Sequence, residues 1–130
     1  MSDRGRIALA WGLTAFYMTA VWFLSSQSLE LPTAILLPGY DKGAHLIEYT
    51  LLGILVASAA LRTWPQRSLI QLVIITVLIT AAWGTLDELH QAFVPGRSSD
   101  AFDLVADVIG GLCGAAMRLG VRAALRSHTA

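Results

Sequence analysis

Long apolar runs separated by short polar segments dominate this chain. The runs over residues 7–29 and 68–86 contain no charged residue. As α-helices they rise about 1.5 Å per residue, so each is long enough to cross a hydrocarbon core about 30 Å thick. Apolar length alone therefore predicts two membrane-spanning helices.

Two further runs, 49–61 and 108–117, are apolar but shorter. They measure about 20 and 15 Å as helices, which is too short to cross a bilayer alone. To span, the second predicted helix must begin near Gly43 and the fourth near Ala101. These extensions bring four ionisable residues to membrane depth: His45, Glu48, Asp103 and Asp107. Such groups are costly in lipid unless they face a bundle interior or a wet cavity, so they indicate a functional site.

The expected fold is all-α: a polytopic membrane protein with a four-transmembrane-helix bundle as its single domain, residues 1–130. Composition agrees, because 55% hydrophobic residues, 14% charged residues and a mean hydropathy of +0.62 depart from those of soluble domains. The lipid bilayer is the expected surrounding, and no nucleic-acid partner is expected. The predicted helices cover about 7–26, 43–61, 68–91 and 101–120.

Net charge is zero, but the signs are segregated in the four-span arrangement. Seven arginines fall on the side of the two termini: Arg4, Arg6, Arg62, Arg67, Arg118, Arg122 and Arg126. The other side carries Lys42, Arg97 and every acid except Asp3. The positive-inside rule places the arginine-rich side in the cytoplasm. We therefore expect a multi-pass protein with both termini cytoplasmic and its acidic loops facing outward.

Polar stripes lie at the outward end of three predicted helices. They consist of Asp41, Lys42, His45, Glu48 and Tyr49 on the second helix, Asp87, Glu88 and Gln91 on the third, and Asp100, Asp103 and Asp107 on the fourth. On the second and fourth helices the acids follow helical spacing and share one face. Turned toward one another, and with Arg97 in the turn before the fourth helix, the stripes predict a polar pocket at the outer leaflet.

A purely structural interpretation of this pocket is also possible. Arg97 would pair with Asp87, Asp100 or Asp103, and Lys42 with Glu48 or Glu88, as interhelical contacts of modest net stability. Eight acids against two cations on this side, however, leave a negative excess that pairing does not neutralise. Some acids must be protonated, exposed to water or bound to a cation.

Two chemical hypotheses follow from the acidic excess. His45 and Glu48, with Asp87, Asp103 or Asp107 from other helices, would make an oxygen-rich site with one imidazole for a divalent cation. His45, Glu48 and Asp103 are its leading candidate ligands, although no fixed ligand spacing supports the site. Alternatively, His45 or Glu48 acts as a general base while Arg97 meets a phosphate or carboxylate by a bidentate contact.

The order of the polar motifs resembles that of the VanZ-like family of small bacterial membrane proteins. The matching motifs are Ser25-Ser26-Gln27 after the first helix, Asp41-Lys42-x-x-His45-x-x-Glu48-Tyr49, Asp87-Glu88-x-x-Gln91-x-Phe93-x-Pro95-Gly96-Arg97-x-x-Asp100-x-x-Asp103, and a glycine-rich last helix. The resemblance covers nearly the whole chain and implies a four-helix protein of the bacterial cytoplasmic (inner) membrane. An asparagine often stands in the family near the position of Asp107, so this chain adds a charge there.

The resemblance also implies a cell-envelope role, since the founding member of the family is associated with low-level teicoplanin resistance. We expect a protein that binds or modifies an envelope ligand, such as a glycopeptide, a lipid headgroup or a wall precursor, with glycopeptide susceptibility as one affected property. The alternatives are a metal-assisted hydrolase or transferase acting on a lipid-linked substrate, and a small transporter. The transporter is disfavoured because the cytoplasmic halves of the spans carry little polarity beyond Thr76 and Thr80. Whether the chain is an enzyme stays open, and the sequence predicts no particular oligomeric state.

The charge pattern makes a direct prediction about topology. A reporter fused after Ala130 should be active only if it functions in the cytoplasm, because the arginine-rich side faces inward. Paired fusions to a cytoplasmic reporter and a periplasmic reporter measure this. Activity of the periplasmic reporter would overturn the four-span orientation.

Overall fold

A computed structural model describes residues 1–27, 40–97 and 99–127. These residues form four helices and no strand: α1 (Asp3–Ser25), α2 (Tyr40–Thr63), α3 (Leu69–Gln91) and α4 (Ala101–Ser127). All four helices are long and apolar enough to cross a membrane. The predicted all-α fold with four membrane-spanning helices is confirmed.

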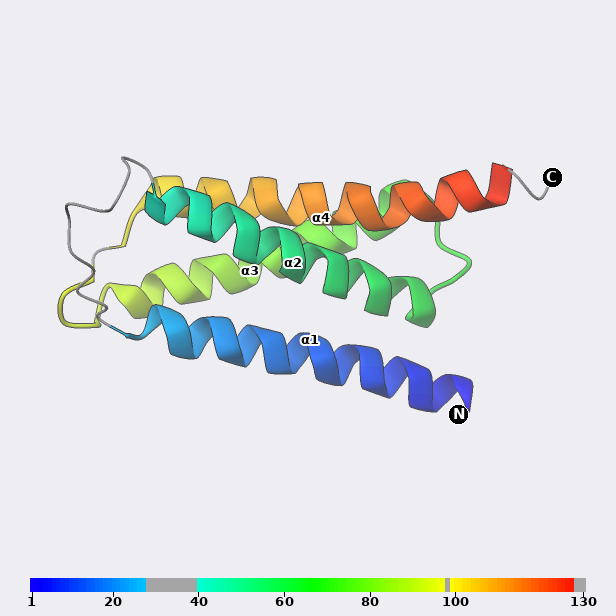
Figure 1. Cartoon of the computed structure of the whole chain (residues 1–130), viewed down its shortest axis with the longest axis horizontal. Coiled ribbons are helices and arrows are strands. Elements are labelled where there is room, and N and C mark those ends of the chain that lie inside the picture. The colour runs from blue at the N-terminus through cyan, green and yellow to red at the C-terminus, as the bar shows by residue number, and fades with distance from the viewer. Residues whose placement is uncertain (28–39, 98, 128–130) are drawn as a thin grey trace.

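Successive helices run in opposite directions, so both chain termini lie at the same end of the bundle (Figure 1). We call this the arginine end, because the termini and the α2–α3 turn carry the seven arginines named above. The opposite end, where α1 and α3 finish and α2 and α4 begin, is called the acidic end. The polar residues singled out in the sequence therefore gather at one end of the bundle.

The helices extend beyond the apolar cores that predicted them. α1 begins at Asp3, where the hydroxyl of Ser2 accepts a hydrogen bond from the Gly5 amide. α3 starts with a capping box, in which the side chains of Ser68 and Gln71 each accept a hydrogen bond from the other's backbone amide. Capping of this kind satisfies backbone amides that have no partner within the helix. It allows a helix to begin in the polar residues that precede its apolar run.

The turn between α3 and α4 has the form expected of its Pro-Gly pair. The Arg97 amide donates to the Val94 carbonyl over 3.1 Å, and Gly96 has a positive φ of 82°. A type II turn requires a positive φ at its third residue, which glycine adopts without steric cost. Asp100 then caps α4, since its carboxylate accepts a hydrogen bond from the Phe102 amide at 2.8 Å.

Glycines bring α2 and α4 into backbone contact. A Cβ atom placed on Gly110 would lie 2.7 Å from the Leu46 carbonyl oxygen, and one on Gly114 would collide with the Thr50 carbonyl. On the facing helix, a Cβ on Gly53 would lie 2.6 Å from the Gly111 carbonyl oxygen. Small residues permit this close approach between membrane helices, where packing takes the place of the hydrophobic effect.

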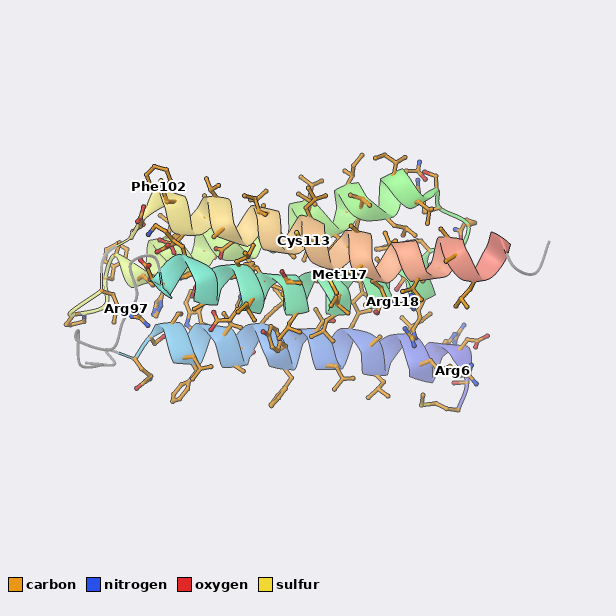
Figure 2. The ribbon with its side chains drawn as sticks, turned by 45° about the horizontal axis from the view of Figure 1, so that its top comes forward. Arg6, Arg97, Phe102, Cys113, Met117 and Arg118 are labelled. Atoms are coloured by element: carbon orange, nitrogen blue, oxygen red, sulfur yellow. The ribbon has the colours of Figure 1, made fainter. Side chains whose placement is uncertain are left out.

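The surface of the bundle is apolar, and its interior contains polar as well as apolar side chains. Large apolar side chains are exposed on every helix, among them Phe16, Leu78, Phe102 and Met117, and Figure 2 shows Phe102 and Met117 on α4. Thr14, Thr76, Thr80, Asp87 and Asp107, by contrast, are almost completely buried. An exposed apolar surface of this extent is typical of a protein that lies in lipid.

The close approach of α2 and α4 predicts a position-specific effect of alanine substitution. Gly114→Ala should lower the stability by about 1–3 kcal/mol, because the added methyl group overpacks the contact with Thr50. Gly120→Ala is the matched control on the same helix, since no atom lies within 4 Å of the place that its added methyl group would take. Thermal unfolding in detergent, followed by circular dichroism, measures both variants. Equal melting temperatures for the two would contradict the glycine-mediated contact.

Candidate functional site

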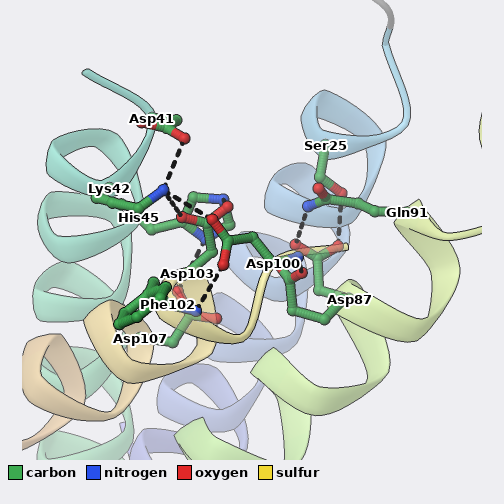
Figure 3. Close-up of polar contacts among 11 residues, drawn as sticks. Ser25, Asp41, Lys42, His45, Asp87, Gln91, Asp100, Phe102, Asp103 and Asp107 are labelled. Carbon is green, nitrogen blue, oxygen red and sulfur yellow. Dashed lines mark hydrogen bonds and ion pairs between the residues drawn. The ribbon is translucent and has the colours of Figure 1, made fainter. Parts of the chain in front are cut away.

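The polar side chains of the acidic end form two neighbouring clusters (Figure 3). One joins α1 to α3 through Asp87. The other joins α2 to α4 through Lys42, His45 and aspartates of α4 and its N-terminal cap. The three polar stripes predicted from the sequence thus face one another, and α1 contributes to the site as well.

Lys42 holds the N-terminal ends of α2 and α4 together. Its Nζ lies 2.9 Å from Asp100, 3.0 Å from Asp41 and 3.3 Å from Asp103. The hydrogen bond from Lys42 holds the pKa of the Asp100 carboxyl below its usual value. Because Lys42, Asp41 and Asp100 remain accessible to water, these pairs orient the helix ends more than they stabilise the fold.

His45 lies between two carboxylates of α4. Its Nδ1 is 2.9 Å from Oδ1 of Asp107, and its Nε2 is 4.0 Å from Oδ2 of Asp103. Asp107 is completely buried, and its second oxygen, Oδ2, has no hydrogen-bond partner. A Cβ atom on Gly84 of α3 would lie only 2.6 Å from this Oδ2, so glycine at position 84 makes the room for the carboxylate.

Glu88 links the end of α3 to the start of α4. Its Oε2 accepts a hydrogen bond from the Asp100 amide at 2.8 Å, while the buried Oε1 has no partner. Ligand atoms of His45, Glu88 and Asp107 lie within 4.8 Å of one another. Each of the two carboxylates grouped with this imidazole therefore keeps one buried oxygen without a partner.

Asp87 lies at the centre of the second cluster and is completely buried. The Ser25 hydroxyl donates to one carboxylate oxygen at 2.5 Å, and the Gln91 amide donates to the other at 3.2 Å. One turn before Ser25, the ring of Trp22 stacks on His90 with a centroid distance of 4.2 Å. Ser25 is the last residue of α1, so this carboxylate ties α1 to α3.

Several predicted site residues lie nearby without joining these clusters. Arg97 is exposed in the α3–α4 turn (Figure 2), and among the described residues it forms no ion pair with Asp87, Asp100 or Asp103. The expected pairing of Lys42 with Glu48 or Glu88 is replaced by its pairing with the aspartates.

Glu48 and Tyr49 take different positions on α2. The Glu48 side chain is half-buried, and its backbone carbonyl accepts a hydrogen bond from the Tyr17 hydroxyl at 3.1 Å. Tyr49 is fully buried, with its hydroxyl unpartnered. Glu30, one of the eight acids on this side in the charge argument, lies outside the described residues.

Residues 6–122 match the VanZ/LLP1 family, a range that contains the acidic end and most of all four helices. The chain belongs to the VanZ/LLP1 family. The resemblance inferred from the polar motifs is thereby confirmed. Searches among curated proteins and among solved structures gave no match.

The possible metal ligands of this VanZ/LLP1 protein fall into two groups within the described part of the chain. One consists of His45, Glu88 and Asp107, and the other of Asp41, Asp100 and Asp103. The ligands proposed from the sequence were His45, Glu48 and Asp103. The first group keeps the imidazole and takes its carboxylates from α3 and α4, whereas Glu48 belongs to neither group.

Sequence reasoning missed two residues on which the site depends. Ser25 appeared only as part of a family motif, and Gly84 had no assigned role. Neither a hydroxyl at the end of an apolar helix nor a glycine within one signals a polar contact by itself. The signal for Gly84 is its position three residues before Asp87, one turn deeper on α3.

The contact between Ser25 and Asp87 predicts a stability difference between adjacent serines. Ser25→Ala should lower the stability by about 1–3 kcal/mol, because a buried carboxylate oxygen loses its donor. Ser26→Ala is the control. The hydroxyls of Ser25 and Ser26 both lie within hydrogen-bond distance of the Trp22 carbonyl, but among the described residues only the Ser25 hydroxyl also reaches Asp87. Thermal unfolding in detergent compares the two. A larger loss in Ser26→Ala would refute this role of Ser25.

Proposed function

We propose that this VanZ/LLP1 protein binds or modifies a ligand of the bacterial envelope in the pocket at its acidic end. The observation that carries the proposal is that Glu88 and Asp107, whose carboxylates group with the His45 ring, each keep one buried oxygen without a partner, Oε1 and Oδ2 respectively. A buried carboxylate oxygen without a donor costs free energy that a bound donor recovers. The site is therefore suited to an ammonium or hydroxyl group of a ligand.

The charge balance supports this choice of ligand chemistry. Seven carboxylates of the acidic end belong to described residues: Asp41, Glu48, Asp87, Glu88, Asp100, Asp103 and Asp107. Lys42 pairs with three of them, of which Asp41 and Asp100 are accessible to water and Asp103 is buried. An anion would be repelled from the interior of the pocket, whereas Arg97 at its exposed turn is available to a carboxylate or phosphate of the same ligand.

Candidate ligands carry both kinds of group. Glycopeptides, lipid headgroups and wall precursors combine amines or hydroxyls with carboxylates or phosphates, and capture of a glycopeptide would alter susceptibility to teicoplanin. The positive-inside rule supports an outward-facing pocket, because the arginine end then lies in the cytoplasm of a bacterial inner-membrane protein. We propose that residues 1–130 form one domain, because the four helices pack against one another in a single bundle.

A second candidate function is metal-assisted hydrolysis or group transfer on a lipid-linked substrate. It is favoured by the grouping of His45, Glu88 and Asp107, since one imidazole with two carboxylates is a plausible ligand set for a divalent transition metal. Transport has less support. The buried hydroxyls of Thr76 and Thr80 bond carbonyls of their own helix, so they do not extend the polar site toward the arginine end.

Replacing Glu88 with glutamine tests the proposed binding. The variant keeps an acceptor for the Asp100 amide but replaces an unpartnered oxygen with an NH₂ donor, so it should weaken binding of a cationic group about tenfold or more. Isothermal titration calorimetry of detergent-solubilised protein measures this, with teicoplanin and phosphatidylethanolamine as probes. Asp3→Asn, which neutralises an exposed acid at the arginine end, should leave binding unchanged.

The same preparations distinguish the two candidate functions. If neither probe binds wild type, or if Glu88→Gln binds as tightly as wild type, the binding proposal is wrong. Elemental analysis after addition and washing of Mn²⁺ or Zn²⁺ addresses the metal site. Retention by wild type and Asp3→Asn, with loss in Glu88→Gln and Asp107→Asn, would favour the enzyme.

A further inference from the structure

A cavity lies at the arginine end of the bundle, opposite the polar clusters of the acidic end. It has a volume of about 470 Å³ and is lined by residues of α1, α2 and α4. Arg6 of α1, Arg62 of α2 and Arg118 of α4 contribute to its wall, and Figure 2 shows Arg6 and Arg118 at this end of the bundle. No acidic residue is found in the described lining. The cavity therefore concentrates positive charge.

Ser58 positions two of these guanidinium groups. Its hydroxyl accepts a hydrogen bond from Nε of Arg118 at 2.9 Å, and its carbonyl accepts one from Nη1 of Arg62 at 3.2 Å. Neither arginine forms an ion pair with a described carboxylate. Each guanidinium has five N–H donors, so several donors remain for an oxyanion.

The rest of the lining is apolar and lies deeper in the bundle. Leu9 and Leu13 follow Arg6 by one and two turns along α1, and Leu55 precedes Arg62 by two turns along α2. Leu9 and Leu13 are about half exposed, at 53% and 51%. The cavity is thus cationic at its outer part, apolar at its inner part and accessible from the side that faces lipid.

We propose that this cavity binds an anionic glycerophospholipid from the leaflet at the arginine end. Its phosphate would lie among Arg6, Arg62 and Arg118, and an acyl chain would lie along Leu9, Leu13 and Leu55. Guanidinium groups bind phosphate oxygens in a bidentate manner, and basic residues at a membrane surface attract anionic lipids. The apolar inner wall selects a lipid over free phosphate, which would leave that wall uncovered. This site is independent of the acidic pocket.

Native mass spectrometry of detergent-solubilised protein tests this site, with phosphatidylglycerol and phosphatidylcholine as competing probes. Wild type should retain phosphatidylglycerol preferentially, and Arg62→Gln/Arg118→Gln should weaken its retention about thirtyfold. Arg4→Gln/Arg67→Gln is the matched control, since it removes two arginines of the same end that do not line the cavity. Its retention should equal that of wild type.

A second variant tests the apolar part while keeping every arginine. Leu13→Trp narrows the inner wall and should reduce retention of phosphatidylglycerol while binding of inorganic phosphate is unchanged. Equal retention of phosphatidylglycerol and phosphatidylcholine by wild type would overturn the proposal, as would an equal loss of phosphatidylglycerol in Arg4→Gln/Arg67→Gln. Full retention of phosphatidylglycerol by Leu13→Trp would also overturn it, and so would a dimer without bound lipid in which Arg118 lies at the interface.

Discussion

The contact between α2 and α4 determines where the polar chemistry of this protein lies. Glycines on both helices let the two backbones meet, and this fixes the rotation of each helix about its axis. From that rotation follow the pairing of Lys42 with Asp100 and Asp103 and the pairing of His45 with Asp107. A side chain at Gly110 or Gly114 would separate the two helices and pull these pairs apart. The glycine contact between α2 and α4 therefore positions the polar side chains of the acidic end.

Carboxylates at membrane depth need partners within the protein. A buried carboxylate must be protonated or receive hydrogen bonds, because lipid provides neither water nor counterions. Asp87 meets this requirement fully, with a donor to each oxygen. Asp107 and Glu88 meet this requirement at only one of their two carboxylate oxygens, because the other oxygen has no partner. This difference is the basis for proposing that Asp87 is structural and that Asp107 and Glu88 bind a ligand.

Local patterns predicted the parts of the structure that depend on local geometry. Apolar length predicted the spans, and helical spacing placed the acids of α2 and α4 on shared faces. Pairing between helices was not predictable in this way, because it depends on how each helix is rotated against its neighbours. Lys42 therefore has different partners from those expected, and Arg97 lies outside the ion pairs.

The same limit explains the two residues that were missed. Gly84 matters because Asp107 approaches it from another helix, and Ser25 because α1 ends beside Asp87. Each contact joins segments distant in sequence, and neither residue type signals it. The metal hypothesis included Glu48 because it shares a face with His45, whereas the structure offers Glu88 from the neighbouring helix. Candidate ligands on one helix are visible in a sequence, and ligands gathered from three helices are not.

The placement of α1 connects the two ends of the molecule. Its buried residues, Thr14, Val21 and Ser25, lie between its midpoint and the acidic end, and Tyr17 and Trp22 in this half also contact other helices. Its first turns carry none of these buried positions and instead line the arginine-rich cavity. One helix therefore contributes Ser25 to the acidic site and one wall to the cavity at the opposite end.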